Sequence, residues 1–343
     1  MAEENILIWL PSPLGDAVMA TPALRAFRTG FSSAPITFLA SPAVRQVLSP
    51  SPFCNDWLDL HPSFVKNIRS IRRGQFQTCI LLKNSFGSAL TAALAGIPNR
   101  IGYARDGRTG LLTRPVRPLK DSSGHFVPLP AIDYYLNIAR FLCLEASDRT
   151  MELSLDDGGE ERLRRNLPAF FSHKGPKVIL VPGGAFGPSK CWPPERFART
   201  ADVLKEQYGA LVIVSIAPTP AEQQIAQTIR QLARSPILCT ADIPLNLSDL
   251  KTLIARADLV ITNDTGPRHI AVAFKRKVIT LFGPNNPQWT QTGWSEEIQI
   301  VGQGPCVPCD NPICRQKQHY CMESITVEQV LEAVRRLWKE PCR

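Results

Sequence analysis

The stretch ILIWLPSPLGDAVMATPAL, residues 6–24, sets the pattern of the whole chain. A strand-like apolar run at 6–10 passes through a turn that contains Pro and Gly into a helix-like segment at 17–28. A buried strand that leads directly into a helix is the repeating unit of α/β folds with parallel sheets. We therefore expect the rest of the chain to alternate strands and helices.

The alternation continues in two series. The first has strand-like runs at 36–39 and 78–82 and helix-like segments at 43–48, 88–95 and 131–144. The second has strand-like runs at 178–181, 211–215, 237–239, 259–262 and 278–282 and helix-like segments at 194–208, 221–233, 248–255 and 269–274. A final helix is expected at 327–339, whereas residues 99–130 are rich in Arg, Gly and Pro and are expected to be mostly loop.

The two series predict two Rossmann-like domains that face each other across a cleft. We expect an N-terminal domain at 1–165, a C-terminal domain at 175–325 and a C-terminal helix at 326–343. The boundary is placed within 152–176, where charged residues are followed by Pro and Gly. Such folds bind ligands at the carboxyl ends of their strands, so the cleft is the expected site.

The composition is that of a globular protein with an anionic partner. Of the 343 residues 44% are hydrophobic and 20% charged, and the formal net charge is +9. No apolar run approaches the ~20 residues of a membrane span, and the acidic start of the chain is unlike a secretory signal. A cytoplasmic protein is therefore expected. Its positive charge favours a phosphorylated lipid or a nucleotide, and because no basic arm is present we expect no nucleic acid partner.

Two Gly-containing junctions between a strand and a helix are candidates for binding phosphate. The first, at 181–193, carries Lys190, a flexible cation suited to a diphosphate. The second, at 263–269, would aim backbone N–H groups at an anion, and Thr265 adds a hydroxyl donor. The alternative is that Asp264 or Thr265 only caps the helix that follows. A dinucleotide fingerprint and a Walker spacing are both absent from the sequence.

Asp16 is the candidate general base. It follows the first strand on a tight turn beside Gly15, where the side chains of an α/β fold face the ligand. A carboxylate that faces nucleotide-binding loops across a cleft can take the proton of an attacking hydroxyl in a sugar transfer. The alternative is that Asp16 caps the helix that begins there.

Several stretches resemble, in the same order along the chain, the motifs of the lipopolysaccharide heptosyltransferases. They are LPSPLGD at 10–16 with ATPAL at 20–24, AGIPNRIGY at 95–103, PGGAFGPSK at 182–190 with WP at 192–193, NDTGPRH at 263–269 and LFGP at 281–284. The form of the 182–190 motif is closest to the heptosyltransferase II branch. The resemblance extends from the first strand to the last helix.

The resemblance implies a GT-B fold, an ADP-L-glycero-D-manno-heptose donor and inverting transfer to an inner-core heptose on Kdo-lipid A. It implies that Asp16 is the base and that catalysis requires no cofactor or metal. It also places the enzyme at the cytoplasmic face of the inner membrane of a Gram-negative-type bacterium, with the anionic membrane surface as a further partner. The residues implied to bind the nucleotide sugar are Ser189, Lys190, Glu222, Asp264, Thr265, Gly266 and His269.

Three positions depart from the residues usual in that family, which leaves donor and acceptor preference open. Gly184 stands in place of Ala, Cys191 in place of Arg and Arg268 in place of Met. One alternative is the same reaction with another nucleotide sugar or acceptor, because a fold does not fix its substrate. Others are a nucleotide-sugar epimerase of GT-B shape and, in another class, a metal-dependent interaction protein built around cysteines.

Basic residues of the first domain are candidates for binding the acceptor. We select Lys66, Arg69, Arg105 and Arg108 because the acceptor implied by the resemblance carries phosphates and carboxylates, which Arg and Lys bind well. The same residues would draw the enzyme to an anionic membrane surface. The alternative is an ordinary solvated face.

Four of the ten cysteines form the pattern C-x2-C-x4-C-x6-C near the end of the chain. They are Cys306, Cys309, Cys314 and Cys321. A Cys-x2-Cys pair lets two thiolates reach one ion, and two more can complete a tetrahedron, so the pattern predicts a structural zinc. Free thiols, or a disulfide formed after purification, are the alternative.

Overall fold

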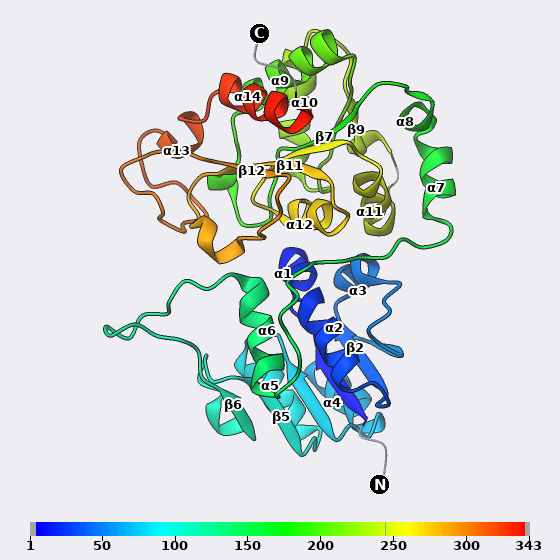
Figure 1. Cartoon of the computed structure of the whole chain (residues 1–343), viewed down its shortest axis with the longest axis vertical. Coiled ribbons are helices and arrows are strands. Elements are labelled where there is room, and N and C mark those ends of the chain that lie inside the picture. Colours follow the sequence, from blue (N-terminus) through cyan, green and yellow to red (C-terminus); the bar gives the residue numbers. More distant parts are fainter. Residues whose placement is uncertain (1–4, 244, 340–343) are drawn as a thin grey trace. The chain divides into compact units, whose positions relative to one another are not determined.

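The computed structural model describes residues 5–243 and 245–339. The chain divides into two compact units, Met1–Ser154 and Leu155–Arg343. Each unit is built on one six-stranded sheet with helices packed against it (Figure 1). Within the described ranges, no helix has the length and apolar character needed to cross a membrane.

The first unit alternates strands and helices along most of its length. Its elements are β1 (Ile6–Trp9), α1 (Leu14–Met19), α2 (Thr21–Gly30), β2 (Ile36–Ala40), α3 (Pro42–Leu48), β3 (Asp56–Asp59), α4 (Phe64–Arg73), β4 (Thr78–Leu81), α5 (Phe86–Leu94), β5 (Asn99–Tyr103), a 3-10 turn η1 (Thr109–Leu111), β6 (Arg114–Val116) and α6 (Ala131–Phe141). Serine caps fix three of the helix starts, because the hydroxyls of Ser41, Ser63 and Ser85 accept hydrogen bonds from the first turns of α3, α4 and α5.

The first sheet is parallel, with strand order β3-β2-β1-β4-β5-β6. Alternate residues of its strands, including Leu7, Trp9 and Leu81, pack against Ile71 of α4 and Ala89 of α5. Residues of opposite parity face the other side of the sheet, where α1, α2, α3 and α6 pack against one another. Burial of the central strands β1, β2 and β4 on both faces accounts for their nearly continuous apolar sequences.

The second unit repeats the alternation. Its elements are α7 (Gly159–Asn166), α8 (Pro168–Ser172), β7 (Lys177–Val181), η2 (Pro188–Lys190), α9 (Pro194–Tyr208), β8 (Leu211–Val214), α10 (Pro220–Leu232), β9 (Leu238–Cys239), η3 (Thr240–Asp242), α11 (Leu247–Ala255), β10 (Leu259–Asn263), α12 (Gly266–Ala273), β11 (Lys277–Phe282), η4 (Pro287–Thr290), β12 (Glu297–Val301), α13 (Tyr320–Glu323) and α14 (Val327–Trp338). A capping box between Thr326 and Gln329 begins α14.

The second sheet is also parallel, with strand order β12-β11-β10-β7-β8-β9. One face is covered by α9, α10, α13 and α14, whose apolar residues form a single core with the strands around the fully buried Trp192. α12 packs against β10 and β11, and α11 packs beside it. β7, β8, β10 and β11 are thus buried in the manner typical of a parallel sheet, whereas the edge strand β12 is only half-buried.

Both sheets have the strand order of the Rossmann fold, which confirms the predicted α/β class. In each, the chain runs outward from a central strand and then returns to its other side, so the order reverses between β1 and β4 in the first unit and between β7 and β10 in the second. Loops at the carboxyl ends of the strands beside such a reversal are where these folds bind ligands.

Residues 99–130 are mostly loop, as expected, but they also contain the short strands β5 and β6, which the sequence patterns do not indicate. β5 begins with Asn99 and Arg100 and contains Gly102, and β6 is the edge strand with a Pro at its centre. Neither shows an apolar run, and an edge strand tolerates Pro because one of its sides lacks a partner strand. The sequence patterns also do not reveal β3, α4 or β12.

Candidate active site

Two loops of the second unit meet where its strand order reverses. Loop 182–190 follows β7, and loop 263–269 joins the end of β10 to the start of α12. The side-chain Nδ2 of Asn263 donates hydrogen bonds to the carbonyl oxygens of Pro182 (2.7 Å) and Gly183 (3.2 Å). Because Asn263 is fully buried, it fixes the two loops to each other as one site.

Two glycines let other site residues approach loop 182–190. A Cβ atom on Gly183 would overlap the carboxyl group of Glu222, which lies in the first turn of α10. A Cβ atom on Gly184 would lie 2.8 Å from Cγ2 of Thr265. The backbone N–H of Ala217 donates to Oε2 of Glu222 at 2.8 Å and so orients its carboxylate. The structure thus brings Glu222 and Thr265 against the same loop.

Lys190 forms a buried ion pair with Asp264. Its Nζ donates to the backbone carbonyl oxygen and to Oδ2 of Asp264, both at 2.9 Å, and lies 4.8 Å from the ring centroid of Phe186. The two residues are 8% and 6% exposed. A lysine ammonium has three N–H donors, and two of them are used here. The charge of Lys190 is therefore balanced by Asp264 within the protein.

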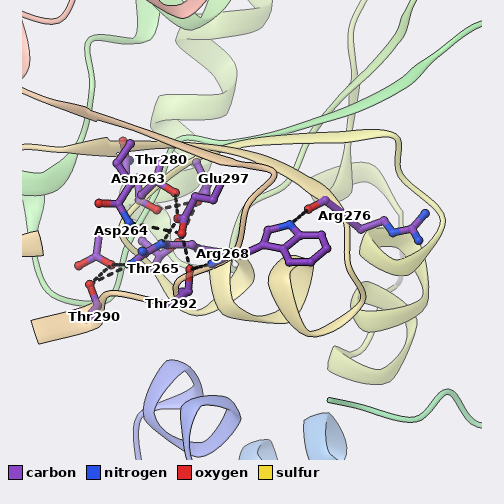
Figure 2. Close-up of polar contacts among 12 residues, drawn as sticks. Asn263, Asp264, Thr265, Arg268, Arg276, Thr280, Thr290, Thr292 and Glu297 are labelled. Carbon is purple, nitrogen blue, oxygen red and sulfur yellow. Dashed lines mark hydrogen bonds and ion pairs between the residues drawn. The ribbon is translucent and has the colours of Figure 1, made fainter. Parts of the chain in front are cut away.

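Arg268, in the first turn of α12, extends this pair into a buried ionic network (Figure 2). Its Nη1 donates to Oδ1 of Asp264 at 2.8 Å, and its Nε donates to Oε1 of Glu297 at 2.6 Å. Glu297 also accepts hydrogen bonds from the hydroxyls of Thr280 (2.7 Å) and Thr292 (2.5 Å). Two cations and two carboxylates therefore balance one another in the interior of the second unit.

The network holds its acidic groups ionised and the neighbouring histidine neutral. Burial opposes ionisation of Asp264, but the charges of Arg268 and Lys190 outweigh it and lower the pKa of Asp264 to about 2. The pKa of Glu297 is lowered as well, because Arg268 overcomes the effect of burial. Burial, assisted by the charge of Arg268, lowers the pKa of His269 to about 3. His269 is therefore an uncharged, buried side chain at neutral pH.

The start of α12 is not capped by a side chain. Thr265 occupies the N-cap position without a capping hydrogen bond, and its Oγ1 lies 3.1 Å from Oγ1 of Thr262. The carboxylate of Asp264 is engaged by Lys190 and Arg268. The capping alternative is therefore wrong for both residues, and the N–H of Gly266 belongs to a helix start of the kind that binds anions.

Ser189 is held by the cysteine-rich segment. Its Oγ donates to the carbonyl oxygen of Asn311 at 2.6 Å, and its N–H donates to that of Pro312 at 3.2 Å. Nε2 of His319 donates to the carbonyl oxygen of Ser189 at 2.6 Å. These three bonds fix the turn that carries Lys190. They also use the hydroxyl hydrogen of Ser189 within the protein.

Asp16 lies at the equivalent place in the first unit, beyond the carboxyl end of β1. It is half-buried in the first turn of α1, whose N-cap is Pro13, so the capping alternative is wrong for Asp16. The phenol of Tyr135 in α6 lies within the electrostatic reach of its carboxylate: burial raises the pKa of Tyr135 well above its usual range, and the charge of Asp16 adds to the rise.

Three of the four predicted acceptor-binding residues have exposed or half-buried side chains. Lys66 and Arg69 are exposed on α4. Arg105 is half-buried after β5, with an ion pair to Asp106 and its guanidinium 4.9 Å from the ring centroid of Phe126. Lys66 and Arg69 are therefore open to solvent, whereas the charge of Arg105 is already paired with Asp106.

Arg108 corrects the prediction of a basic surface, because it is fully buried. Its Nε donates to the carbonyl oxygen of Tyr103 (2.9 Å), its Nη1 to that of Lys83 (2.6 Å) and its Nη2 to Oδ1 of Asn84 (2.7 Å). These bonds join the ends of β4 and β5. Arg108 thus connects two loops of the first unit by hydrogen bonds and does not lie on a basic surface.

The four clustered cysteines all lie in the second unit, three of them on the segment between β12 and α13. Cys321 is buried in α13, and the other three are half-buried free thiols. Burial raises the pKa of Cys321, and the three other thiols raise it further, so the group is close enough to interact. Throughout the described parts of the chain, however, no set of three or more His, Cys, Asp or Glu side chains could hold a metal ion. The zinc stays a prediction.

Several residues of the site carry no signal in the sequence. Glu297 and Thr290 lie outside every motif, and Arg268 stands out only as an unusual residue within one. Their roles depend on contacts with residues that are distant along the chain. Asn263 differs from these residues, because the sequence could have indicated its role. It directly precedes Asp264, and a polar residue at the end of a buried strand must find hydrogen-bond partners there.

Two Rossmann-type units, each with a six-stranded parallel sheet of the same strand order, have the architecture of the GT-B fold, which glycosyltransferases share with some nucleotide-sugar epimerases. The sequence profile described as "Glycosyltransferase family 9 (heptosyltransferase)" matches residues 64–319. The chain therefore belongs to glycosyltransferase family 9.

Relatives of known name agree with this assignment over nearly the full length. The chain is 26% identical over 340 residues to lipooligosaccharide heptosyltransferase 2 of Campylobacter jejuni, covering 97% of this chain and 99% of the relative. The structure of the Escherichia coli ADP-heptose LPS heptosyltransferase II is similar with a TM-score of 0.79 at 24% identity, covering 98% and 99% of the two chains. That of the E. coli heptosyltransferase WaaC with ADP-2-deoxy-2-fluoro heptose has a TM-score of 0.71 at 16% identity, covering 97% and 99%.

Proposed function

We propose that this chain transfers heptose from ADP-L-glycero-D-manno-heptose to the inner core of lipopolysaccharide, with heptosyl-Kdo-lipid A as acceptor and with inversion. The observation that carries the proposal is the meeting of Lys190 and Asp264 on two loops at the strand reversal of the second unit, with the carboxyl group of Glu222, from the first turn of α10, against Gly183 of one of these loops. The names of the relatives, which include ADP-heptose and lipooligosaccharide, support the classes of donor and acceptor.

The second unit is proposed to bind the donor. Lys190 and the N–H of Gly266 at the start of α12 would hold the diphosphate and stabilise the charge that grows on departing ADP, so this step needs no divalent ion. Glu222, whose carboxylate lies against Gly183, would accept hydrogen bonds from the ribose hydroxyls. Asp264 and Thr265 would orient the sugar.

The reaction is proposed to be a single displacement with Asp16 as general base. The acceptor hydroxyl oxygen forms a bond to the anomeric carbon while the bond from that carbon to the diphosphate oxygen breaks. ADP leaves with the electron pair, and the proton of the hydroxyl passes to the carboxylate of Asp16. Attack opposite to the leaving group inverts the configuration of the anomeric carbon.

The first unit is proposed to bind the acceptor and the membrane. Lys66, Arg69 and Arg105 would pair with phosphates and Kdo carboxylates. Their charge would also attract the protein to an anionic membrane surface, and each cation near such a surface contributes about 1 kcal/mol. We therefore place the enzyme at the cytoplasmic face of the inner membrane of a Gram-negative-type bacterium.

The experiment that tests this function is consumption of ADP-heptose with and without a lipid-linked acceptor. A heptosyltransferase releases ADP in proportion to acceptor, whereas an epimerase converts the donor without one. Matched assays with other nucleotide sugars test the same reaction on another donor. Absence of acceptor-dependent turnover with ADP-heptose would reject the proposal.

Asp16→Asn tests the base. The substitution keeps the size of the side chain and removes the proton acceptor, so turnover should fall by about a hundredfold or more while ADP affinity is unchanged. Asp157→Asn, at an exposed aspartate, is the matched control. Turnover that survives in the Asp16 variant would remove Asp16 from the reaction.

A structural zinc on Cys306, Cys309, Cys314 and Cys321 remains our expectation from their spacing, separate from the reaction. Elemental analysis of protein purified anaerobically without a chelator should give about one zinc per chain. A zinc content near zero ends this expectation.

A further inference from the structure

The two cations that pair with Asp264 differ in their freedom to move. Arg268 is fully buried, and its guanidinium is fixed by Asp264, by Glu297, by a 2.8 Å hydrogen bond to Oγ1 of Thr290 and by the ring of Phe282 at 4.9 Å. Lys190 ends a flexible side chain in loop 182–190 and uses two donors, both on Asp264. Lys190 is therefore the partner that can leave.

The carboxylate of Asp264 divides its two oxygens between these cations. Oδ2 accepts from Lys190, whereas Oδ1 accepts from Arg268 and, at 3.2 Å, from Thr290. A buried carboxylate that loses its only cation is strongly destabilised and takes up a proton instead. Asp264 avoids this, because after departure of Lys190 its other oxygen would still be paired.

We propose that Arg268 is a positioning residue that keeps Asp264 compensated as an anion, so that the ammonium of Lys190 can move to the donor diphosphate without proton uptake. The inference rests on the proposed function, in which Lys190 binds that diphosphate. Glu297 assists Arg268, because its carboxylate accepts the hydrogen bond of Nε and so fixes the orientation of the guanidinium whose Nη1 contacts Asp264.

The charged and titratable groups that face Asp264 are few. Lys190 approaches it from loop 182–190, Arg268 and His269 approach it from α12, and Glu297 faces Arg268 from β12. His269 stays neutral over the working range because its pKa is about 3. In the wild type, where Arg268 is present, proton uptake in this region on binding of an anion would therefore be attributable to the carboxylates.

The test uses the full chain, ADP as the probe and calorimetry in buffers of different ionisation enthalpy. Arg268→Met/Glu297→Gln removes one buried cation together with one buried carboxylate, so the net charge of the network is conserved. This variant should take up close to one more proton per bound ADP than the wild type. Relative to the wild type, the affinity of this variant for ADP should therefore fall by up to about tenfold for each unit by which the pH rises between about pH 5.5 and 8. Comparison with the wild type cancels the titration of ADP itself.

Two further variants separate this role from a merely structural one. Adding Asp264→Asn to the double variant should abolish the extra proton uptake, because the group that takes up the proton is gone. Glu297→Gln alone leaves Arg268 paired with Asp264, so this variant should take up no more protons on binding ADP than the wild type does. It tests the inference even if the double variant does not fold. Extra proton uptake in Glu297→Gln would overturn the inference, as would identical proton uptake and pH dependence in the double variant and the wild type. A wild type that fails to bind ADP would overturn the proposed function and this inference together.

Discussion

Among the described residues, each unit of this protein buries one arginine completely, and the two are held in opposite ways. Arg108 of the first unit donates to backbone carbonyls and to the neutral side chains of Asn84 and Ser88. Arg268 of the second unit donates to two carboxylates, those of Asp264 and Glu297. Burial lowers the pKa of Arg108, and its nearest hydrogen-bond acceptors carry no charge to oppose this.

The difference shows what each arginine does at the carboxyl ends of the strands in its unit. Five donors in a rigid plane let Arg108 connect the loops after β4 and β5, which is a structural task. The guanidinium of Arg268 acts also through its charge, because it sets the ionisation of the carboxylate that Lys190 contacts. In this protein, the buried arginine that donates to carbonyl oxygens holds loops in place, whereas the one that pairs with carboxylates also controls their ionisation.

The largest expected effect on stability follows Arg268→Ala. It leaves Glu297 buried without its cation, so the unfolding free energy should fall by about 3–5 kcal/mol at neutral pH. In the wild type Arg268 lowers the pKa of Glu297. In the variant that lacks Arg268, the pKa of Glu297 should instead rise above its value in the unfolded chain. The loss should therefore shrink as the pH falls and Glu297 takes up a proton. Denaturant unfolding at several pH values measures this, and a loss that is constant with pH would contradict the electrostatic role.

The unfolding free energy of the wild type should also depend on pH, with a decrease at acid pH that we call the acid limb. Asp264 has a pKa of about 2, below its usual 3.8, so its contribution to stability is fully present above about pH 4 and is lost as the pH falls toward 2. The contribution corresponds to about 2–3 kcal/mol at most, because one pKa unit is worth about 1.4 kcal/mol. Asp264→Asn should flatten this limb, and an unchanged acid limb in that variant would contradict the assignment.

A smaller and pH-independent effect is expected for Arg108→Met. The variant leaves the carbonyl oxygens of Lys83 and Tyr103 with one donor fewer, at a cost of about 1–3 kcal/mol in unfolding free energy. None of its acceptors titrates, so the loss should be constant between about pH 5 and 8. A pH-dependent loss like that of Arg268→Ala would remove the contrast between the two arginines.

The smallest effect on stability is expected for exposed cations. Lys66→Glu/Arg69→Glu should change the unfolding free energy by no more than about 0.5 kcal/mol. If α4 binds the acceptor as proposed, the same variant should raise the KM for the lipid-linked acceptor several-fold and leave kcat unchanged. Lys174→Glu, at an exposed lysine of the second unit, is the control for charge alone. An unaltered KM would show that this part of α4 is a solvated face.

Local sequence determined much of the framework. Alternating apolar runs and Gly-containing turns indicate the strands and helices, because burial of a parallel sheet on both faces requires continuous apolar strands. The same patterns place Asp16 after β1 and the loops of Lys190 and Asp264 after β7 and β10. They do not reveal β5 and β6, whose polar, Gly- and Pro-containing sequences lack such runs.

Only the tertiary structure decided which charged residues meet and which are buried. Lys190 and Asp264 lie 74 positions apart, and Arg268 meets Glu297 across 29, so no local pattern pairs them. Arg105 and Arg108 are neighbours in one basic stretch, yet the first is half-buried and the second fully buried. Burial of a charge depends on the hydrogen-bonding groups that distant strands and loops place around it. The sequence thus determined which residues could form the site, and the packing within each unit decided their partners and their charge.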